Sequence, residues 1–298
     1  MPLNKPYCKE LLSPLVRLFI QRSGLDATAG GEEIISALVE GVRRRYARKR
    51  CANHLQLFLN ERHIHHVEVA PQLSCDGFIE PLGITFADGF RMLLKKNSAE
   101  SRMRFTMAHE VCHTFFYELV PELKFAAHSP DQQEERLCNF GAAALLMPPV
   151  MLRRSARDLP VCLESLQRLA EDFSVSLPSM AIRLKSLRLW NCQLSLWRRM
   201  VNGTFALDGF YGGKRVAWEW QDDTILQTAW ESDEPLTGRT FVSYQDYRAV
   251  RRYRPIAFQI RRYGEGVMAL WGNAIKPTRS SPTLPLFEKP NPVPLAVC

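Results

Sequence analysis

The sequence has no long uncharged run and no cysteine pair of the CxxC type. The longest stretch without a charged residue, Leu137–Leu152, has about 16 residues and contains Pro148-Pro149, so it is too short and too broken to span a bilayer. The apolar stretch Leu11–Ile20 is interrupted by Pro14 and Arg17, and we expect no signal peptide there. The eight cysteines are scattered, which is typical of reduced thiols in the cytoplasm. These absences favour a soluble cytoplasmic protein without a membrane partner.

The first half of the chain also has almost no excess charge. Residues 1–149 contain 18 Lys and Arg against 17 Asp and Glu, whereas residues 150–298 contain 21 against 14. The net charge of +8 is therefore concentrated in the second half. This asymmetry indicates either an acidic partner, such as nucleic acid or an acidic protein face, or simply a solvated basic surface.

What the sequence does contain is an HExxH motif at His109–His113. On a helix, positions i and i+4 lie on one face, so His109 and His113 can offer two imidazole nitrogens to one zinc ion. Glu110 lies beside them and can reach a water molecule on the metal. Ser101 is placed to cap the start of this helix. The flanking apolar residues predict a buried helix: Met103, Phe105, Met107, Ala108, Val111, Cys112, Phe115 and Phe116.

A catalytic zinc ion needs a third protein ligand and one open position. Residues Asp131–Met147 predict a second helix, with Asp131 as its N-cap and Pro148 at its end. Two carboxylates, Glu134 and Glu135, lie in its first turn, and spacing alone does not decide between them. The alternative for Glu135 is an ordinary solvated carboxylate in the first turn of a helix.

Two blocks of the sequence together resemble a known family. Arg104–His113 and Glu135–Pro148 are similar to the pattern RFTxAHExxH followed by E-x-x-x-N-x-x-A-x-x-LLMP of the ImmA/IrrE family of zinc metallopeptidases. Matching to this pattern assigns the third ligand to Glu135, four residues before Asn139, and not to Glu134.

The resemblance covers about residues 55–150 and extends more weakly to about residue 190. One departure is Cys112, where the family often has glycine, and we expect only a difference in packing. The resemblance implies a bacterial or phage cytoplasmic endopeptidase that cleaves a helix-turn-helix repressor in a stress or mobile-element response. It further implies Zn²⁺ as cofactor, with Mn²⁺ as a possible substitute in vitro.

A small antiparallel sheet is expected directly before the HExxH helix. Phe78–Glu80 and Ile84–Phe86 predict two short strands, Ala87–Gly89 predicts a hairpin turn, and Phe90–Leu94 predicts the strand that follows it. An extended substrate could add to such a sheet as a further strand.

The region after the second helix has helix-turn-helix spacing. Leu163–Trp190 predicts a short helix, a turn and a second helix that would display Arg183, Lys185 and Arg188. Such a helix could contact DNA, but its start at Leu177–Ser179 is poor for reading bases. We therefore favour a helical module that supports the peptidase or docks its substrate.

The expected fold class is α+β. It comprises a zinc metallopeptidase domain at 1–150 with a helical zincin-like architecture, a helix-turn-helix-like segment at 151–190, a β-rich domain at 191–275 and a proline-rich, disordered tail at 276–298.

The chemistry expected of this motif is metal-assisted hydrolysis of a peptide bond. His109, His113 and Glu135 would hold zinc, and Glu110 would act as general base and then as acid. Tyr117 and His128 are candidates for stabilising the oxyanion, and Asn139 for orienting a ligand. Two alternatives stay open: a DNA-binding transcription regulator with a structural zinc site, and an antitoxin or scaffold that binds a repressor without cleaving it.

Overall fold

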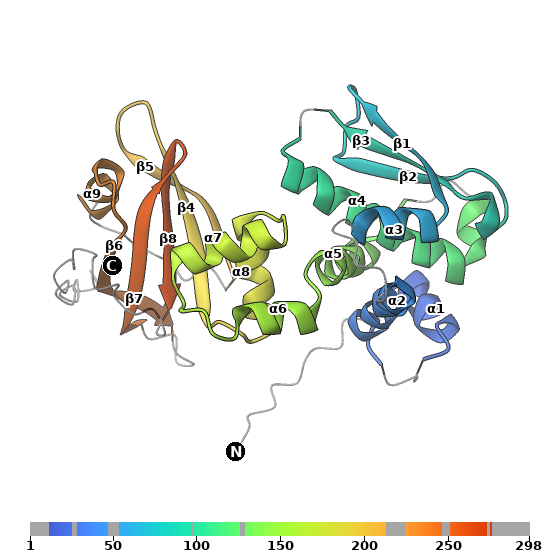
Figure 1. Ribbon diagram of the computed structural model, residues 1–298, viewed down its shortest axis with the longest axis horizontal. Coiled ribbons are helices and arrows are strands. Elements are labelled where there is room, and N and C mark those ends of the chain that lie inside the picture. The colour runs from blue at the N-terminus through green and yellow to red at the C-terminus, as the bar shows by residue number, and fades with distance from the viewer. Residues whose placement is uncertain are drawn as a thin grey trace, which may run out of the picture. The chain divides into compact units, whose positions relative to one another are not determined.

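The structure is a computed structural model that describes residues 12–25, 29–46, 54–96, 98–125, 129–212, 224–245, 251–272 and 275. Its residue contacts divide the chain into two units, Met1–Pro148 and Pro149–Cys298 (Figure 1). The predicted tail at 276–298 lies outside the described residues, and the finer division of the second half at residue 190 stays a prediction. None of the described helices is long and apolar enough to cross a membrane.

The first unit combines a three-stranded sheet with five α-helices among its described residues, which confirms the α+β prediction. Its elements are α1 (Pro14–Arg22), α2 (Gly31–Tyr46), α3 (His54–Glu61), β1 (Ile64–Ala70), β2 (Gly77–Pro81), the 3₁₀ turn η1 (Phe86–Asp88), β3 (Phe90–Lys95), α4 (Glu100–Leu119), the 3₁₀ turn η2 (Pro121–Phe125) and α5 (Gln132–Leu146).

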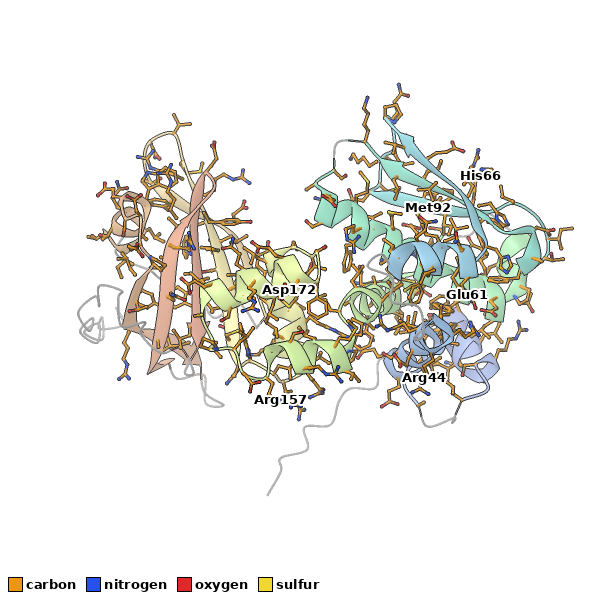
Figure 2. All side chains as sticks on the ribbon, in the orientation of Figure 1. Arg44, Glu61, His66, Met92, Arg157 and Asp172 are labelled. Carbon is orange, nitrogen blue, oxygen red and sulfur yellow. The ribbon has the colours of Figure 1, made fainter. Side chains whose placement is uncertain are left out.

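The sheet of the first unit has the order β1-β3-β2, with β2 antiparallel and β1 parallel to the central strand β3. Alternate residues of β3 are buried, and Phe90, Met92 and Leu94 form its inner row. Met92 is labelled on the sheet in Figure 2. Both β2 and β3 contact α4, so this face of the sheet covers the HExxH helix. The strand β2 lies at one edge of the sheet and runs beside the helix.

The prediction of a strand at Ile84–Phe86 is wrong. The Asp88 carboxylate accepts hydrogen bonds from Thr85 N at 2.7 Å and Thr85 Oγ1 at 2.9 Å, and this draws the segment into the turn η1. Gly89, with a φ of +81°, then leads into β3. Because Pro81 pairs with Phe90, the two strands are joined by a longer loop than the predicted tight turn.

Helices α4 and α5 pack against each other and form the centre of the first unit. The α4 helix is buried over most of its surface from Thr106 to Tyr117. It begins at Glu100, so the predicted cap Ser101 lies inside the helix and Ala99 occupies the cap position without a side-chain hydrogen bond. Asp131 caps α5 as predicted, with its carboxylate accepting from the backbone N–H groups of Gln133 and Glu134.

A buried arginine ties the start of the sheet to α4. Arg62 is 3% exposed, and it donates to Thr114 Oγ1 at 2.8 Å and to Glu118 Oε2 at 2.7 Å. Its guanidinium also lies 4.5 Å from the ring centroid of Phe86 and 4.1 Å from that of Phe115. These contacts satisfy a charge that would otherwise be costly to bury, and they fix the middle of α4 beside the sheet.

The second unit contains four described α-helices and a five-stranded antiparallel sheet of order β5-β4-β8-β7-β6. Its elements are α6 (Pro149–Ala156), α7 (Leu163–Asp172), α8 (Leu177–Ser186), β4 (Cys192–Arg199), β5 (Phe205–Tyr211), α9 (Thr224–Glu231), β6 (Leu236–Gln245), β7 (Arg251–Tyr263) and β8 (Gly266–Gly272). Phe258 and Trp271 are fully buried in its core with ring centroids 5.2 Å apart.

The helix α8 faces the sheet of its own unit rather than solvent. It contacts β4 and β5, and Arg183 is only 3% exposed, which corrects the prediction that this arginine decorates the outside of the helix. Burial lowers the pKa of Arg183 to about 10. Lys185 donates to Asn191 Oδ1 at 2.9 Å, and Ile182 is the large apolar residue that α8 exposes.

Candidate metal centre

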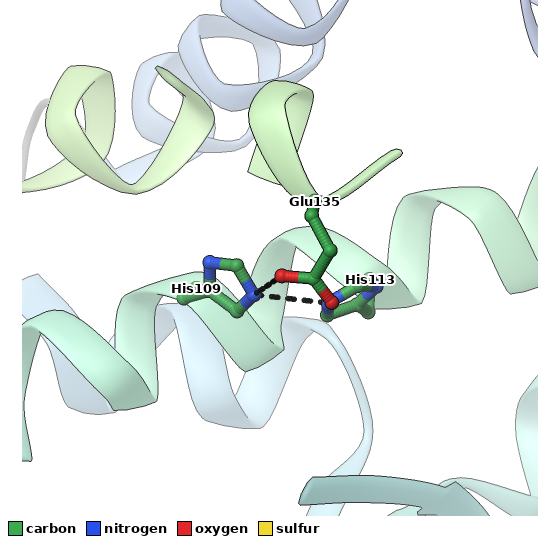
Figure 3. A group of neighbouring side chains, drawn as sticks. All are labelled: His109, His113 and Glu135. Carbon is green, nitrogen blue, oxygen red and sulfur yellow. Dashed lines mark hydrogen bonds and ion pairs between the residues drawn. The ribbon is translucent and has the colours of Figure 1, made fainter. Parts of the chain in front are cut away.

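Helices α4 and α5 bring the three predicted ligands together. His109 and His113 lie one turn apart on α4, and Glu135 reaches them from the first turn of α5 (Figure 3). The distance is 3.0 Å between the two Nε2 atoms, 3.1 Å from His109 Nε2 to Glu135 Oε2, and 3.6 Å from His113 Nε2 to Glu135 Oε1. Two imidazole nitrogens and the two oxygens of one carboxylate, from two helices, therefore meet at one point.

The second nitrogen of each imidazole has its own partner on α5. His109 Nδ1 lies 3.1 Å from Asn139 Oδ1, and His113 Nδ1 lies 2.8 Å from Glu134 Oε1. An ionised carboxylate and an amide oxygen only accept, so a ring that is neutral carries its proton on Nδ1 and leaves the lone pair of Nε2 for a metal ion. In that tautomer both rings offer Nε2 at the point where Glu135 arrives.

This arrangement fits a zinc ion. Two imidazoles and a carboxylate are ordinary zinc ligands, and ligand atoms about 2.0–2.1 Å from one tetrahedral ion lie roughly 3.3 Å from each other. The observed separations of 3.0, 3.1 and 3.6 Å surround that value. Glu135 is about half exposed, with 44% of its side chain accessible, so the site is open on one side.

The carboxylates around the two imidazoles favour a cation at this site. Burial alone lowers the pKa of His113, but the hydrogen bond to Glu134 and the charges of Glu110, Glu134 and Glu135 outweigh burial and raise it. The hydrogen bond to His109 holds the pKa of Glu135 below its ordinary value. Positive charge near these imidazoles is therefore stabilised, whether it is a proton or a metal ion.

Glu110 is 6% exposed and lies against the first residue of β2. Burial raises the pKa of its carboxyl group, although the nearby His113 and His109 oppose this shift. A Cβ added to Gly77 would lie only 2.9 Å from Glu110 Oε1 and 2.4 Å from Thr106 Cγ2. The absence of a side chain at Gly77 thus leaves room for the Glu110 carboxylate between the helix and the strand.

Three further residues were predicted to take part in the site: Asn139, Tyr117 and His128. Asn139 contacts His109 through the hydrogen bond given above, from an exposed position on α5. Tyr117 is 6% exposed and packs on Phe90, and burial followed by the charges of Glu134 and Glu110 raises its pKa to about 12. His128 lies outside the described residues.

Two residues of the site had no role in the sequence analysis. Gly77 was not singled out, and no local pattern marks it. Glu134 was considered only as a rival for the ligand position, yet it is fully buried and bonded to His113. A signal for it does exist: Glu134, Cys138, Ala142 and Leu145 recur at helical spacing and are all buried, so Glu134 occupies the inner face of α5.

A second group of potential ligands lies on the inner side of His113. Its members are His113, Glu134 and Cys138, all buried. Burial raises the pKa of the Cys138 thiol well above its usual value, which keeps the sulfur protonated and a weak ligand. The group is also closed to solvent, whereas catalysis requires an open position.

Comparison with known proteins agrees with this geometry. Residues 82–185 match the family model Peptidase_M78, described as an IrrE N-terminal-like domain. The match contains α4 and α5 with His109, Glu110, His113 and Glu135, whereas Gly77 lies before it. It confirms the predicted resemblance to the ImmA/IrrE family. It supports a zincin-like metallopeptidase domain, and hence a bound metal.

The other comparisons add little. A search of curated proteins finds no match. A solved structure of a Mycobacterium tuberculosis transcriptional regulator is similar with a TM-score of 0.46 and 13% sequence identity, and the alignment covers 86% of this chain and 79% of that one. At this level of similarity it assigns neither fold nor function.

Proposed function

We propose that this chain is a zinc-dependent endopeptidase whose ligands are His109, His113 and Glu135. The observation that carries the proposal is the convergence of the two Nε2 atoms and the Glu135 carboxylate at 3.0–3.6 Å, beside the buried carboxylate of Glu110. The match to a metallopeptidase family over the same residues supports it.

A bound zinc ion would supply Lewis acidity, which lowers the pKa of water and polarises a carbonyl group. Glu110 would accept the proton of the attacking water and pass it to the leaving amine. Asn139 would orient the imidazole of His109 through its Nδ1 atom. Tyr117, one helical turn after His113, stays the candidate donor to a developing oxyanion, since its hydroxyl is protonated near neutral pH.

We propose a helix-turn-helix repressor as the substrate, and the cytoplasm as the location. The substrate rests on the family resemblance. The free thiols of Cys75, Cys112, Cys138, Cys162 and Cys192 support a reducing compartment.

A Glu110→Gln variant tests the mechanism. The amide is nearly isosteric and cannot accept the proton, so the variant should bind zinc as the wild type does and lose about 10²–10⁴-fold or more in cleavage rate. The assay is incubation with a helix-turn-helix repressor, taken from the adjacent gene if that gene encodes one, in zinc and separately in manganese, with products identified by mass spectrometry. Glu68→Gln, the same change on exposed strand β1, should cleave normally. Full cleavage by Glu110→Gln would reject Glu110 as the base.

The two alternatives predict different results in the same experiment. A DNA-binding regulator should retard DNA by itself in a salt-dependent manner, but the buried Arg183 and the apolar Ile182 give α8 a poor surface for phosphate and base contacts. A non-cleaving scaffold should bind the repressor and leave it intact with either metal.

A further inference from the structure

Glu134 is a fully buried carboxylate that ordinary packing does not explain. Its exposed fraction is 0%, and its Oε1 atom lies 2.8 Å from Nδ1 of His113, itself 3% exposed. Burying a carboxylate is costly unless hydrogen bonds and nearby positive charge compensate. The compensation here comes from His113 and from the first turn of α5, whose positive end is fixed by the Asp131 cap.

The position of this hydrogen bond determines what it does to the imidazole. A neutral histidine carries one proton, on either Nδ1 or Nε2, and its ring can rotate about the Cβ–Cγ bond. A carboxylate at Nδ1 requires the proton there and holds the plane of the ring. Nε2 is then unprotonated and directed toward Glu135, 3.6 Å away.

We propose that Glu134 is a positioning residue that holds His113 in the tautomer and orientation needed to bind the metal. This inference rests on the proposed metal site at His109, His113 and Glu135. Asn139 accepts at Nδ1 of His109 as Glu134 does at Nδ1 of His113, so each histidine has one acceptor on α5. The adjacent carboxylates Glu134 and Glu135 therefore have different roles. Glu135 binds the ion from the open side, and Glu134 orients a ligand from within the core.

The rival arrangement places the metal on the other side of His113, among His113 Nδ1, Glu134 and Cys138. In that case Glu134 would be a ligand and Glu135 would not. The hydrogen-bond distance of 2.8 Å favours the positioning role, and the two arrangements respond differently to substitution.

The test measures metal binding directly, without peptidase activity. Cobalt(II) is titrated into the full-length, metal-free chain, and the visible absorption bands report the geometry of the site while competition with a chelator gives the dissociation constant. Loss of an outer partner of a metal-binding histidine costs about 10–100-fold in affinity. Glu134→Ala should therefore bind cobalt about 10–100-fold more weakly and with altered bands.

Glu134→Gln should recover most of the affinity, because the amide oxygen can accept the Nδ1 proton. Asn139→Ala should weaken binding in the same manner as Glu134→Ala, and because Asn139 is exposed this second variant tests the role of the acceptor even if Glu134→Ala fails to fold. Gln132→Ala, an exposed change in the same helical turn, is the matched control and should bind normally.

Three results would overturn the inference. Wild-type affinity and bands in Glu134→Ala, with binding lost in Glu135→Ala, would leave the metal site intact and remove the role of Glu134. Equal weakening by Glu134→Gln and Glu134→Ala would show that charge, and not the acceptor, matters. Binding that survives Glu135→Ala but is lost in Cys138→Ala would move the metal to the inner group and reject the proposed site as well.

Discussion

The contact between Gly77 and Glu110 gives a prediction whose size follows from the structure. In Gly77→Ala the new Cβ would lie 2.4 Å from Thr106 Cγ2 and 2.9 Å from Glu110 Oε1, whereas ordinary contacts lie at 3.4–4 Å. The Thr106 methyl would have to retreat by about 1 Å and the carboxylate by about half as much. The two groups are on adjacent turns of α4, so both displacements act on the part of the helix that carries the base.

A displacement of about 1 Å costs about 10²-fold in rate, so a shift of about half that size in the catalytic carboxylate should cost about 10-fold, roughly 1.4 kcal/mol in the activation barrier. We expect Gly77→Ala to lower kcat by about 10-fold with the substrate that the wild type cleaves. Its affinity for zinc should stay unchanged, because the nearest atoms to the new methyl group belong to Thr106 and Glu110 and not to the ligands.

Thr106→Ser removes the closer of the two clashes while keeping the hydroxyl. The double variant with Gly77→Ala should therefore recover part of the lost activity. Gly41→Ala is the control, because a Cβ there meets nothing within 4 Å and an exposed helical position should gain up to about 1 kcal/mol in stability. Wild-type turnover in Gly77→Ala would refute the argument, and so would loss of zinc.

Two further predictions concern the packing and the metal. Gly141→Ala would bring a Cβ to 2.7 Å from Cys112 Sγ, so it should destabilise the first unit by about 1–3 kcal/mol in urea unfolding. Adding Cys112→Ala should restore most of that loss, and no restoration would place the clash elsewhere. Removing the metal with a chelator should lower the melting temperature of the first unit, since a metal at 100 times its dissociation constant contributes about 2.7 kcal/mol. All six tryptophans lie between Trp190 and Trp271, so tryptophan fluorescence reports on the second unit and should change little. An equal shift in the melting temperatures of the two units would contradict the assignment of the metal site to the first unit.

The parts of the fold that sequence predicted are those governed by local pattern. The i, i+4 histidines and the apolar surroundings predicted a buried helix, and Asp131 followed by a helical pattern predicted the start of α5. The family resemblance then selected Glu135 over Glu134, which spacing could not do, because both carboxylates lie in the same turn.

The parts that sequence did not predict depend on contacts between distant segments. Ile84–Phe86 has the composition of a strand, but the Asp88 side chain bonds Thr85 and produces a turn. Arg183 is charged, yet α8 packs it inward. The importance of Gly77 arises only when β2 reaches α4, and a glycine at the start of a strand carries no local sign of what will lie beside it.

The helical pair α4–α5 has a consequence for protein design. Every atom proposed to bind or orient the metal lies between His109 and Asn139, in two helices that are consecutive α-helices of the first unit. This hairpin could be grafted onto another helical scaffold and carry its metal affinity along. Its base would not work there in the same way, because the space for the Glu110 carboxylate is supplied by a glycine from a different part of the chain. Metal binding in this fold thus depends on the two helices alone, whereas hydrolysis also depends on a residue of the sheet.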